Sequence, residues 1–179
     1  MTQTAKNYAD ALYELASDEG LAEEIYPQIN EIGLLFHGNP DYPKLLSAPN
    51  IGLSERLSIL DQAFSGWVHR YVLSFLKLLC EQGHIRELPT CVERFNARYD
   101  EDRGIVHIKV TTAVPLTRDQ KARIHKRMCA YTGKSVEESY RVDPAVLGGI
   151  RMEYDGKELD GTVRQRLEGL RKTLSDTVL

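Results

Sequence analysis

The sequence predicts two domains of different fold class: an all-α six-helix bundle over residues 1–104, followed by a small α/β (α+β) domain over residues 105–179. Apolar residues recur about every 3.6 residues in the first segment, as in helices, and about every second residue just after it, as in strands. A polar run at 100–104 separates the two patterns. Net charge also changes sign: nine Lys/Arg against 16 Asp/Glu give −7 before residue 105, and 14 against 10 give +4 after it.

Two apolar stripes run along the first expected helix, which Gly20 ends. One stripe comprises Tyr8, Leu12 and Leu15. The other is made mostly of small residues and comprises Ala5, Ala9, Leu12 and Ala16. Because small side chains let another helix approach closely, we expect this helix to contact neighbours on two sides.

Three further helices follow at helical spacing of apolar residues. They span 21–36, which Gly38 and Pro40 end, a short segment at 42–46, and a fourth segment at 53–64. A sixth helix carries apolar residues from Ile85 to Tyr99.

The fifth expected helix, residues 67–83, is apolar around most of its circumference, because its polar residues fall on one narrow stripe. Such a helix is either the central helix of its bundle or has a second face for a partner. The spacing alone leaves both interpretations open.

The second domain begins with an alternating strand at 106–110. Thr117 and Gln120 form a capping box that begins a helix ending at Gly133, with Ile124, Met128 and Tyr131 expected to face inward. Alternation at 136–142 predicts a second strand.

A hairpin and a final helix are expected in the remaining chain. Gly148 and Gly149 predict a tight backbone bend before an alternating strand at 150–154, and the dipeptide 155–156 is a favoured Asp-Gly hairpin turn. After a second Asp-Gly, Thr162 and Gln165 form another capping box. Four apolar residues at helical steps then predict a helix that packs on the hairpin: Val163, Leu167, Leu170 and Leu174.

No established catalytic or nucleotide-binding motif occurs, and neither a metal site nor a cofactor site is expected. The five histidines are scattered one to an expected element, without a second ligand at metal spacing. Three cysteines without a pairing pattern fit a reducing compartment. No run is long and apolar enough to span a bilayer, and residues 1–20 lack a signal-peptide core, so we expect a cytosolic protein or one held at a membrane by a partner.

Two other functions remain to be weighed. Asp143, Asp155 and Asp160 are candidates for an acid/base cluster, although each precedes Pro or Gly, where an aspartate commonly caps a turn. The helix at 117–131 is strongly basic, which suits an RNA-binding or regulatory adaptor. Against nucleic acid, the strands lack surface aromatic residues and the whole chain is acidic.

Five fragments, in order, resemble one family, the delta subunit of bacterial F-type ATP synthase, homologous to the mitochondrial oligomycin-sensitivity-conferring protein. They are the Tyr-Ala-x-Ala-Leu stretch from Tyr8, Leu-x-x-Leu with Gly-His-Ile at 76–85, Thr-Ala-Val-Pro-Leu-Thr at 112–117, Val-Asp-Pro…Gly-Gly at 142–149 and Asp-Gly-Thr at 160–162. The motif residues of the second domain are Asp143, Pro144, Gly148, Gly149, Asp160, Gly161 and Thr162. Thr162 stands where the family usually has Ser, His84 where it has Arg, and Glu158 where it tends to be apolar.

The resemblance implies a non-catalytic stator subunit of the peripheral stalk, at the cytoplasmic face of the membrane but not inserted in it. It implies that domain 1–104 binds the alpha-subunit N-termini of the catalytic head in a groove between its first and fifth helices. Domain 105–179 is then expected to bind the b subunits, its basic surplus favouring an acidic stretch of b. The implied groove residues are Ala5, Tyr8, Ala9, Leu12, Ala16, Val72, Leu73, Leu76 and Leu79.

Overall fold

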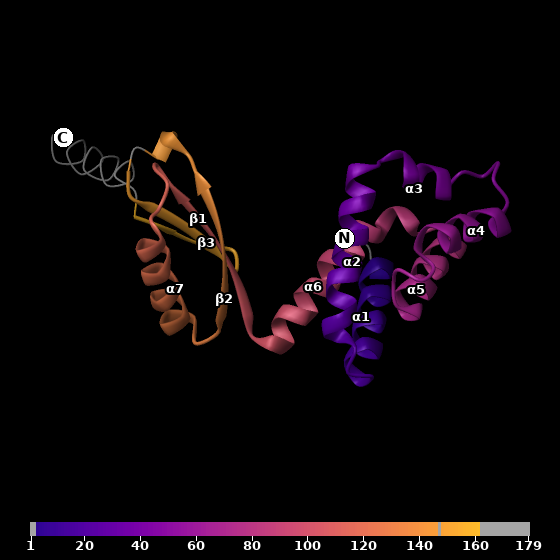
Figure 1. Ribbon diagram of the computed structural model, residues 1–179, viewed down its shortest axis with the longest axis horizontal. Helices are drawn as coiled ribbons and strands as arrows, with labels where there is room; N and C mark the ends of the chain where they lie inside the picture. Colours follow the sequence, from indigo (N-terminus) through magenta and orange to yellow (C-terminus); the bar gives the residue numbers. More distant parts are fainter. Residues whose placement is uncertain (1–2, 147, 162–179) are drawn as a thin grey trace, which may run out of the picture. The chain divides into compact units, whose positions relative to one another are not determined.

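The computed structural model describes residues 3–146 and 148–161 and divides the chain into two compact units, Met1–Glu101 and Asp102–Leu179. The first unit is helical, and the second combines a sheet with a helix (Figure 1). A helical N-terminal part followed by an α/β part is therefore confirmed. The expected helix after residue 162, with its capping box at Thr162 and Gln165, lies outside the described residues.

The helical unit contains six α-helices and one short 3₁₀-helix within its described residues. They are α1 (Gln3–Asp18), α2 (Ala22–Gly38), α3 (Asp41–Leu46), α4 (Leu53–Phe64), α5 (Arg70–Glu81), η1 (Ile85–Glu87) and α6 (Leu88–Arg103), whose last residues extend past the boundary between the units. The fifth helix is shorter than the expected 67–83. His69 precedes its first turn and accepts a hydrogen bond from the backbone N–H of Tyr71 through its ring, which marks the start of the helix.

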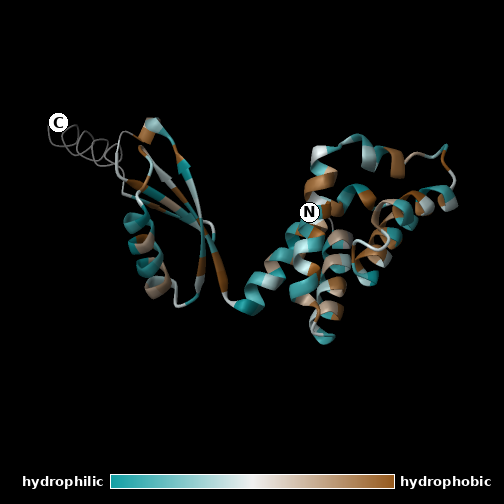
Figure 2. Cartoon of the chain, viewed as in Figure 1, coloured by the Kyte–Doolittle hydropathy of each residue, from teal (hydrophilic) through white to brown (hydrophobic). Residues whose placement is uncertain are grey.

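The core of this unit is formed by the inward faces of all six helices. Its largest fully buried side chains include Phe95 of α6, Ile25, Ile29 and Ile32 of α2, and Leu60 of α4. Along its helices, brown hydrophobic stretches alternate with teal hydrophilic ones (Figure 2). Leu15, a member of the first apolar stripe of α1, is 40% exposed.

The second unit has a four-stranded mixed sheet in the order β2-β1-β3-β4. Its elements are β1 (Ile105–Thr112), α7 (Arg118–Thr132), β2 (Ser135–Val142), η2 (Pro144–Val146), β3 (Ile150–Tyr154) and β4 (Lys157–Asp160). Strand β1 pairs in parallel with β2, which the intervening α7 makes possible, and antiparallel with β3. The expected strands, capped helix and hairpin of this region are confirmed.

Helix α7 covers the sheet through Met128, which joins Ile108, Val110, Val136 and Tyr154 in one buried cluster. The predicted capping box is present: Gln120 N–H donates to the Thr117 hydroxyl over 3.3 Å, and Thr117 N–H donates to Gln120 Oε1 over 2.8 Å.

Tyr131, in contrast, does not face inward. It is 65% exposed in the last turn of α7, where its ring packs edge-to-face with that of Tyr154 at 6.1 Å between ring centres.

Candidate partner-binding surfaces

The small-residue stripe of α1 lies in the core of the helical unit. Ala5, Ala9 and Ala16 are fully buried and Leu12 is 5% exposed, so these side chains bring α1 close to helices of the same chain. Of the predicted groove residues on this helix, Tyr8 alone is partly exposed, and its ring lies 6.0 Å from that of His84. The stripe therefore explains how α1 packs within its own unit.

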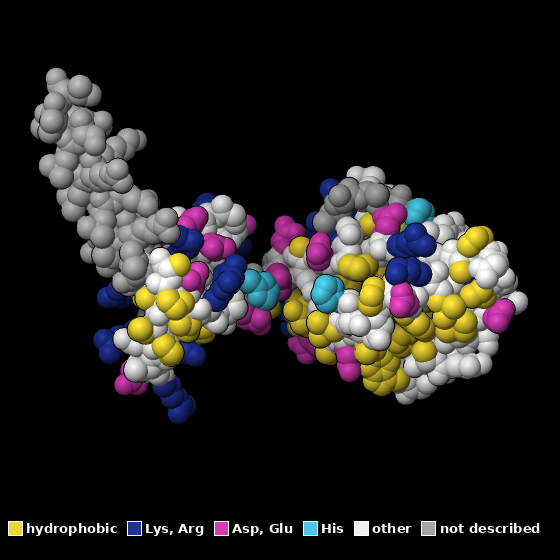
Figure 3. All heavy atoms as spheres, turned by 90° about the horizontal axis from the view of Figure 1, so that it is seen from above, with side chains coloured by type: hydrophobic (Ala, Val, Ile, Leu, Met, Phe, Trp, Pro, Cys, Tyr) yellow, Lys and Arg dark blue, Asp and Glu magenta, His cyan; other side chains and the backbone are white. Residues whose placement is uncertain are grey.

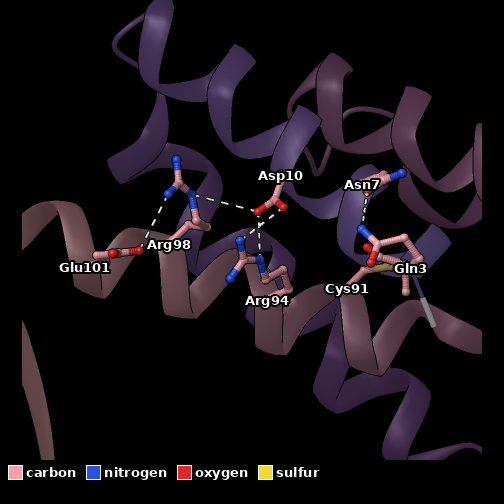
Figure 4. Close-up of polar contacts among 8 residues, drawn as sticks. Gln3, Asn7, Asp10, Cys91, Arg94, Arg98 and Glu101 are labelled. Carbon is pink, nitrogen blue, oxygen red and sulfur yellow. Dashed lines mark hydrogen bonds and ion pairs between the residues drawn. The ribbon is translucent and has the colours of Figure 1, made fainter. Parts of the chain in front are cut away.

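A polar network fastens the outer side of α1 to α6 (Figure 4). Asp10 accepts two hydrogen bonds from Arg94, to Oδ1 over 2.7 Å and to Oδ2 over 3.1 Å, in a bidentate arrangement. Arg98 lies 3.8 Å from the same carboxylate and 3.6 Å from Glu101. Deeper along the same pair of helices, the Cys91 thiol donates to the carbonyl of Ala5 over 3.5 Å.

Helix α5 packs in the core of its unit along much of its apolar surface, and part of that surface stays exposed, including Leu78 at 40%. Val72, Leu76 and Leu79 are fully buried, while Leu73 is partly exposed. Lys77, on the polar stripe, forms an ion pair with Asp61 of α4 over 2.6 Å. Of the nine predicted groove residues, seven thus lie in the core, and Tyr8 and Leu73 reach the surface.

An apolar hollow that the sequence analysis missed lies at the junction of α2, α3 and the end of α4. It has a volume of about 690 Å³ and is lined by three aromatic rings and two leucines, with Asn39 and Asp41 at its polar rim. The apolar lining comprises Leu35, Tyr42, Leu45, Ala63, Phe64 and Trp67. Leu35, Leu45 and Trp67 of this lining are each more than 40% exposed, which helical spacing alone does not show. Hydrophobic side chains gather on the face of the helical unit seen in Figure 3.

The motif residues of the second unit hold its backbone turns. Asp143 accepts a hydrogen bond from Ala145 N–H over 3.0 Å at the start of η2, which begins with Pro144. Gly148 and Gly149 have positive φ of 138° and 87°, which confirms the predicted bend. A Cβ atom on Gly161 would lie 3.3 Å from the carbonyl oxygen of Ile150, which accepts the Gly161 N–H.

The other two aspartates considered for acid/base chemistry lie in the β3–β4 hairpin. Asp160 lies 3.7 Å from Arg151 across the hairpin, and Asp155, with φ of 47°, occupies the turn that joins the two strands. Glu158, where the resembling family tends to be apolar, is exposed and pairs with Arg151 over 3.1 Å. Thr162 lies outside the described residues.

The basic residues of α7 form an exposed cationic face. They are Arg118, Lys121, Arg123, Lys126 and Arg127. Lys121 places its ammonium group 4.5 Å from the centre of the Tyr140 ring on β2, a cation–π contact within the unit. Among the described residues, no helix has the length and hydropathy needed to cross a membrane, and no group of three or more His, Cys, Asp or Glu side chains is arranged to hold a metal ion.

Comparisons with known proteins agree over nearly the whole chain. A family model described as ATP synthase delta (OSCP) subunit matches residues 4–174. Two similar proteins are each called ATP synthase subunit delta. The one from Desulfitobacterium hafniense (strain DSM 10664 / DCB-2) is 33% identical over 171 residues, 96% of both chains. The one from Lacticaseibacillus casei (strain BL23) is 31% identical, covering 95% of this chain and 94% of the relative.

A solved structure supports the same fold. A chain in the cryo-EM structure of the Toxoplasma gondii mitochondrial ATP synthase hexamer superposes with a TM-score of 0.74, covering 97% of this chain and 98% of that one. The two sequences are 16% identical, so this likeness shows the fold alone.

Proposed function

The chain belongs to the ATP synthase delta (OSCP) subunit family, and on that premise we propose that its two units bind different partners in the peripheral stalk. It is a stator subunit of F-type ATP synthase. In our proposal the helical unit, acting as one six-helix bundle over residues 1–104, binds the N-termini of the alpha subunits. The unit over residues 105–179 binds the membrane-anchored b subunits. The match of the family model over residues 4–174 carries this proposal.

The mechanical role follows from these two attachments. A stator must resist the torque that the central rotor exerts on the catalytic head, which requires tight binding and no chemistry by the stator itself. The local structural roles of Asp143 and Asp160 are consistent with a non-catalytic subunit. We place the protein at the cytoplasmic face of the cell membrane, held there peripherally by the b subunits.

The burial of α1 and α5 narrows the proposed alpha-subunit site. A peptide that lies along these two helices contacts Tyr8 and Leu73, the predicted groove residues that reach the surface. The seven buried groove residues pack between the helices and set the distance between them. An amphipathic helix is the expected form of the peptide, because its apolar face can cover partly exposed apolar residues.

The test is a calorimetric titration of the full chain with a synthetic peptide matching the N-terminal segment of the alpha subunit from the same organism. We expect one-to-one binding with a negative heat-capacity change, because apolar surface is buried. Replacing Tyr8 or Leu73 by Asp should weaken binding by about tenfold or more, as expected for truncation of a central contact. Leu76 and Leu79 are unsuitable for this test, because a charge at a fully buried position would unfold the unit.

Two controls locate the site. Leu34→Asp places the same charge at an α2 leucine that is 72% exposed and should leave binding unchanged. Trp67 is the only tryptophan in the chain and lines the apolar hollow, so its emission should not change when the peptide binds at α1 and α5. Tight binding that shifts Trp67 emission and ignores Tyr8 and Leu73 would move the site to the hollow. Absence of binding to both peptide and assembled head would contradict the proposed partner.

A further inference from the structure

Two titratable side chains of α7 and one of strand β2 contact one another in the second unit. Cys129 and His125 are one helical turn apart, and the Cys129 Sγ lies 3.6 Å from His125 Nε2. The other ring nitrogen, Nδ1, lies 2.9 Å from Glu138 Oε1 on the neighbouring strand β2. The Glu138 side chain is 12% exposed and the His125 side chain 52% exposed, so a shielded carboxylate orients an accessible imidazole.

This order of groups is the one that activates a thiol. A nucleophile within reach of a base, with that base oriented by a third group, is the general arrangement of activated nucleophiles. His125 Nε2 can accept the thiol proton while Nδ1–H donates to Glu138, which stabilises the imidazolium that results. The thiolate is the reactive form of cysteine, so a base placed to take the thiol proton assists the attack by Cys129.

A hollow beside the thiol supplies a binding place for a reactant. Its volume is about 500 Å³, and its lining includes Cys129 and His125 together with Arg103 and Lys134. The exposed ammonium group of Lys134 favours a small reactant that carries carboxylates. The hollow is polar, in contrast to the apolar hollow of the helical unit.

We propose that Cys129 is a modification site for anionic low-molecular-weight disulfides, such as oxidised glutathione, with His125 as base and Glu138 as its positioning residue. The Cys129 thiolate attacks one sulfur of the bound disulfide. A protein–S–S–R bond forms while the S–S bond of the reactant breaks, and the leaving thiolate takes up the proton held by His125. The products are the mixed disulfide and one free thiol, so no additional oxidant is needed.

The other two cysteines are shielded from the same reaction. Cys80 and Cys91 are fully buried, and their thiols lie 3.6 Å from the carbonyl oxygen of Leu46 and 3.5 Å from that of Ala5. Burial raises the pKa of the Cys91 thiol to about 12 and also raises the pKa of Cys80. Each is therefore held as a thiol behind packed side chains, and both serve as internal controls.

The first experiment treats the folded full chain with oxidised glutathione and with dithiobis(nitrobenzoate), a dianionic disulfide, and identifies the modified residue by peptide mass. We expect a single adduct, on Cys129, and none in Cys129→Ser. His125→Gln should slow the reaction by about tenfold, because the base is lost. Modification of Cys80 or Cys91 before Cys129, or an unchanged rate in His125→Gln, would overturn the proposal.

A second comparison tests the reactant class and the role of Glu138. Lys134→Glu should slow dithiobis(nitrobenzoate) by about fivefold but leave the uncharged dithiodipyridine unaffected, because only the former is attracted to the cationic rim. Equal slowing of both reagents would reject selection for anions. Glu138→Gln should slow the modification of Cys129, because His125 loses the carboxylate that orients it, and Glu138→Asp should restore the rate. An unchanged rate in Glu138→Gln would show that Glu138 does not act through His125.

Discussion

At the residue scale, Gly33 shows how closely α2 approaches α6. A Cβ atom built on Gly33 would lie 3.3 Å from Cγ2 of Val92, a side chain that is itself 8% exposed in the core. Glycine within a helix costs backbone entropy on folding. At this position its missing side chain lets α2 and α6 approach closely.

We predict that Gly33→Leu destabilises the helical unit by about 1–3 kcal/mol, the usual cost of forcing extra methylene groups into a packed interior. Urea unfolding followed by the emission of Trp67, which lies in the same unit, measures the change. Gly38→Leu is the matched control, because a Cβ there would meet nothing within 4 Å. Equal stability of Gly33→Leu and wild type would mean that the two helices separate easily.

Residue patterns predicted that the small-residue stripe of α1 is a contact surface, but not which helices it contacts. The stripe of Ala5, Ala9 and Ala16 was correctly identified as a contact surface, and all three are fully buried. Their contacts are made within the chain, which periodicity cannot reveal, because a small side chain permits close packing against any helix. The same pattern is therefore equally compatible with an internal neighbour and with a partner.

At the element scale, α7 depends on the capping box at its start. The helix is strongly basic, and Met128 is its one buried residue, so packing against the sheet contributes little to its stability. The box satisfies two backbone N–H groups that would otherwise lack partners. Gly133, in the left-handed conformation with φ of 66°, ends the helix.

Thr117→Ala should therefore destabilise α7 by about 1 kcal/mol, the typical cost of losing an N-cap side chain. Faster amide hydrogen exchange in the first turns of α7 is the expected observation. Thr117→Ser keeps the hydroxyl group and should restore wild-type protection. If Ser and Ala exchanged alike, the hydroxyl would not be the stabilising group.

The elements that local rules specify were predicted most fully. Capping boxes, left-handed glycines and Asp-Gly turns depend on residues close in sequence, so α7 and the β3–β4 hairpin could be predicted from the chain alone. The apolar hollow could not, because it is assembled from α2, α3 and the end of α4, whose packing no local pattern specifies. The inward position predicted for Tyr131 was wrong for a related reason. Helical spacing does not show how much of α7 lies over the sheet.

At the scale of the whole molecule, the two units have opposite charge, −7 over residues 1–104 and +4 over residues 105–179. The cationic excess of the second unit is concentrated on α7, whose five basic residues are exposed. The surface proposed to bind the alpha-subunit peptide is instead apolar. The two proposed interfaces should consequently differ in how they respond to salt.

We predict that affinity of the chain for a soluble segment of the b subunit falls steeply with ionic strength, while affinity for the alpha-subunit peptide changes little. Exposed charges are screened beyond about 10 Å at 0.1 M salt, whereas apolar burial does not depend on counter-ions. Arg123→Gln combined with Lys126→Gln should weaken binding of the b segment at low salt and flatten its salt dependence. Lys44→Gln with Arg70→Gln removes two exposed basic residues from the helical unit and should change neither measurement. A salt-independent b interface would instead assign that contact to an apolar surface and leave the basic face of α7 without a role in the stalk.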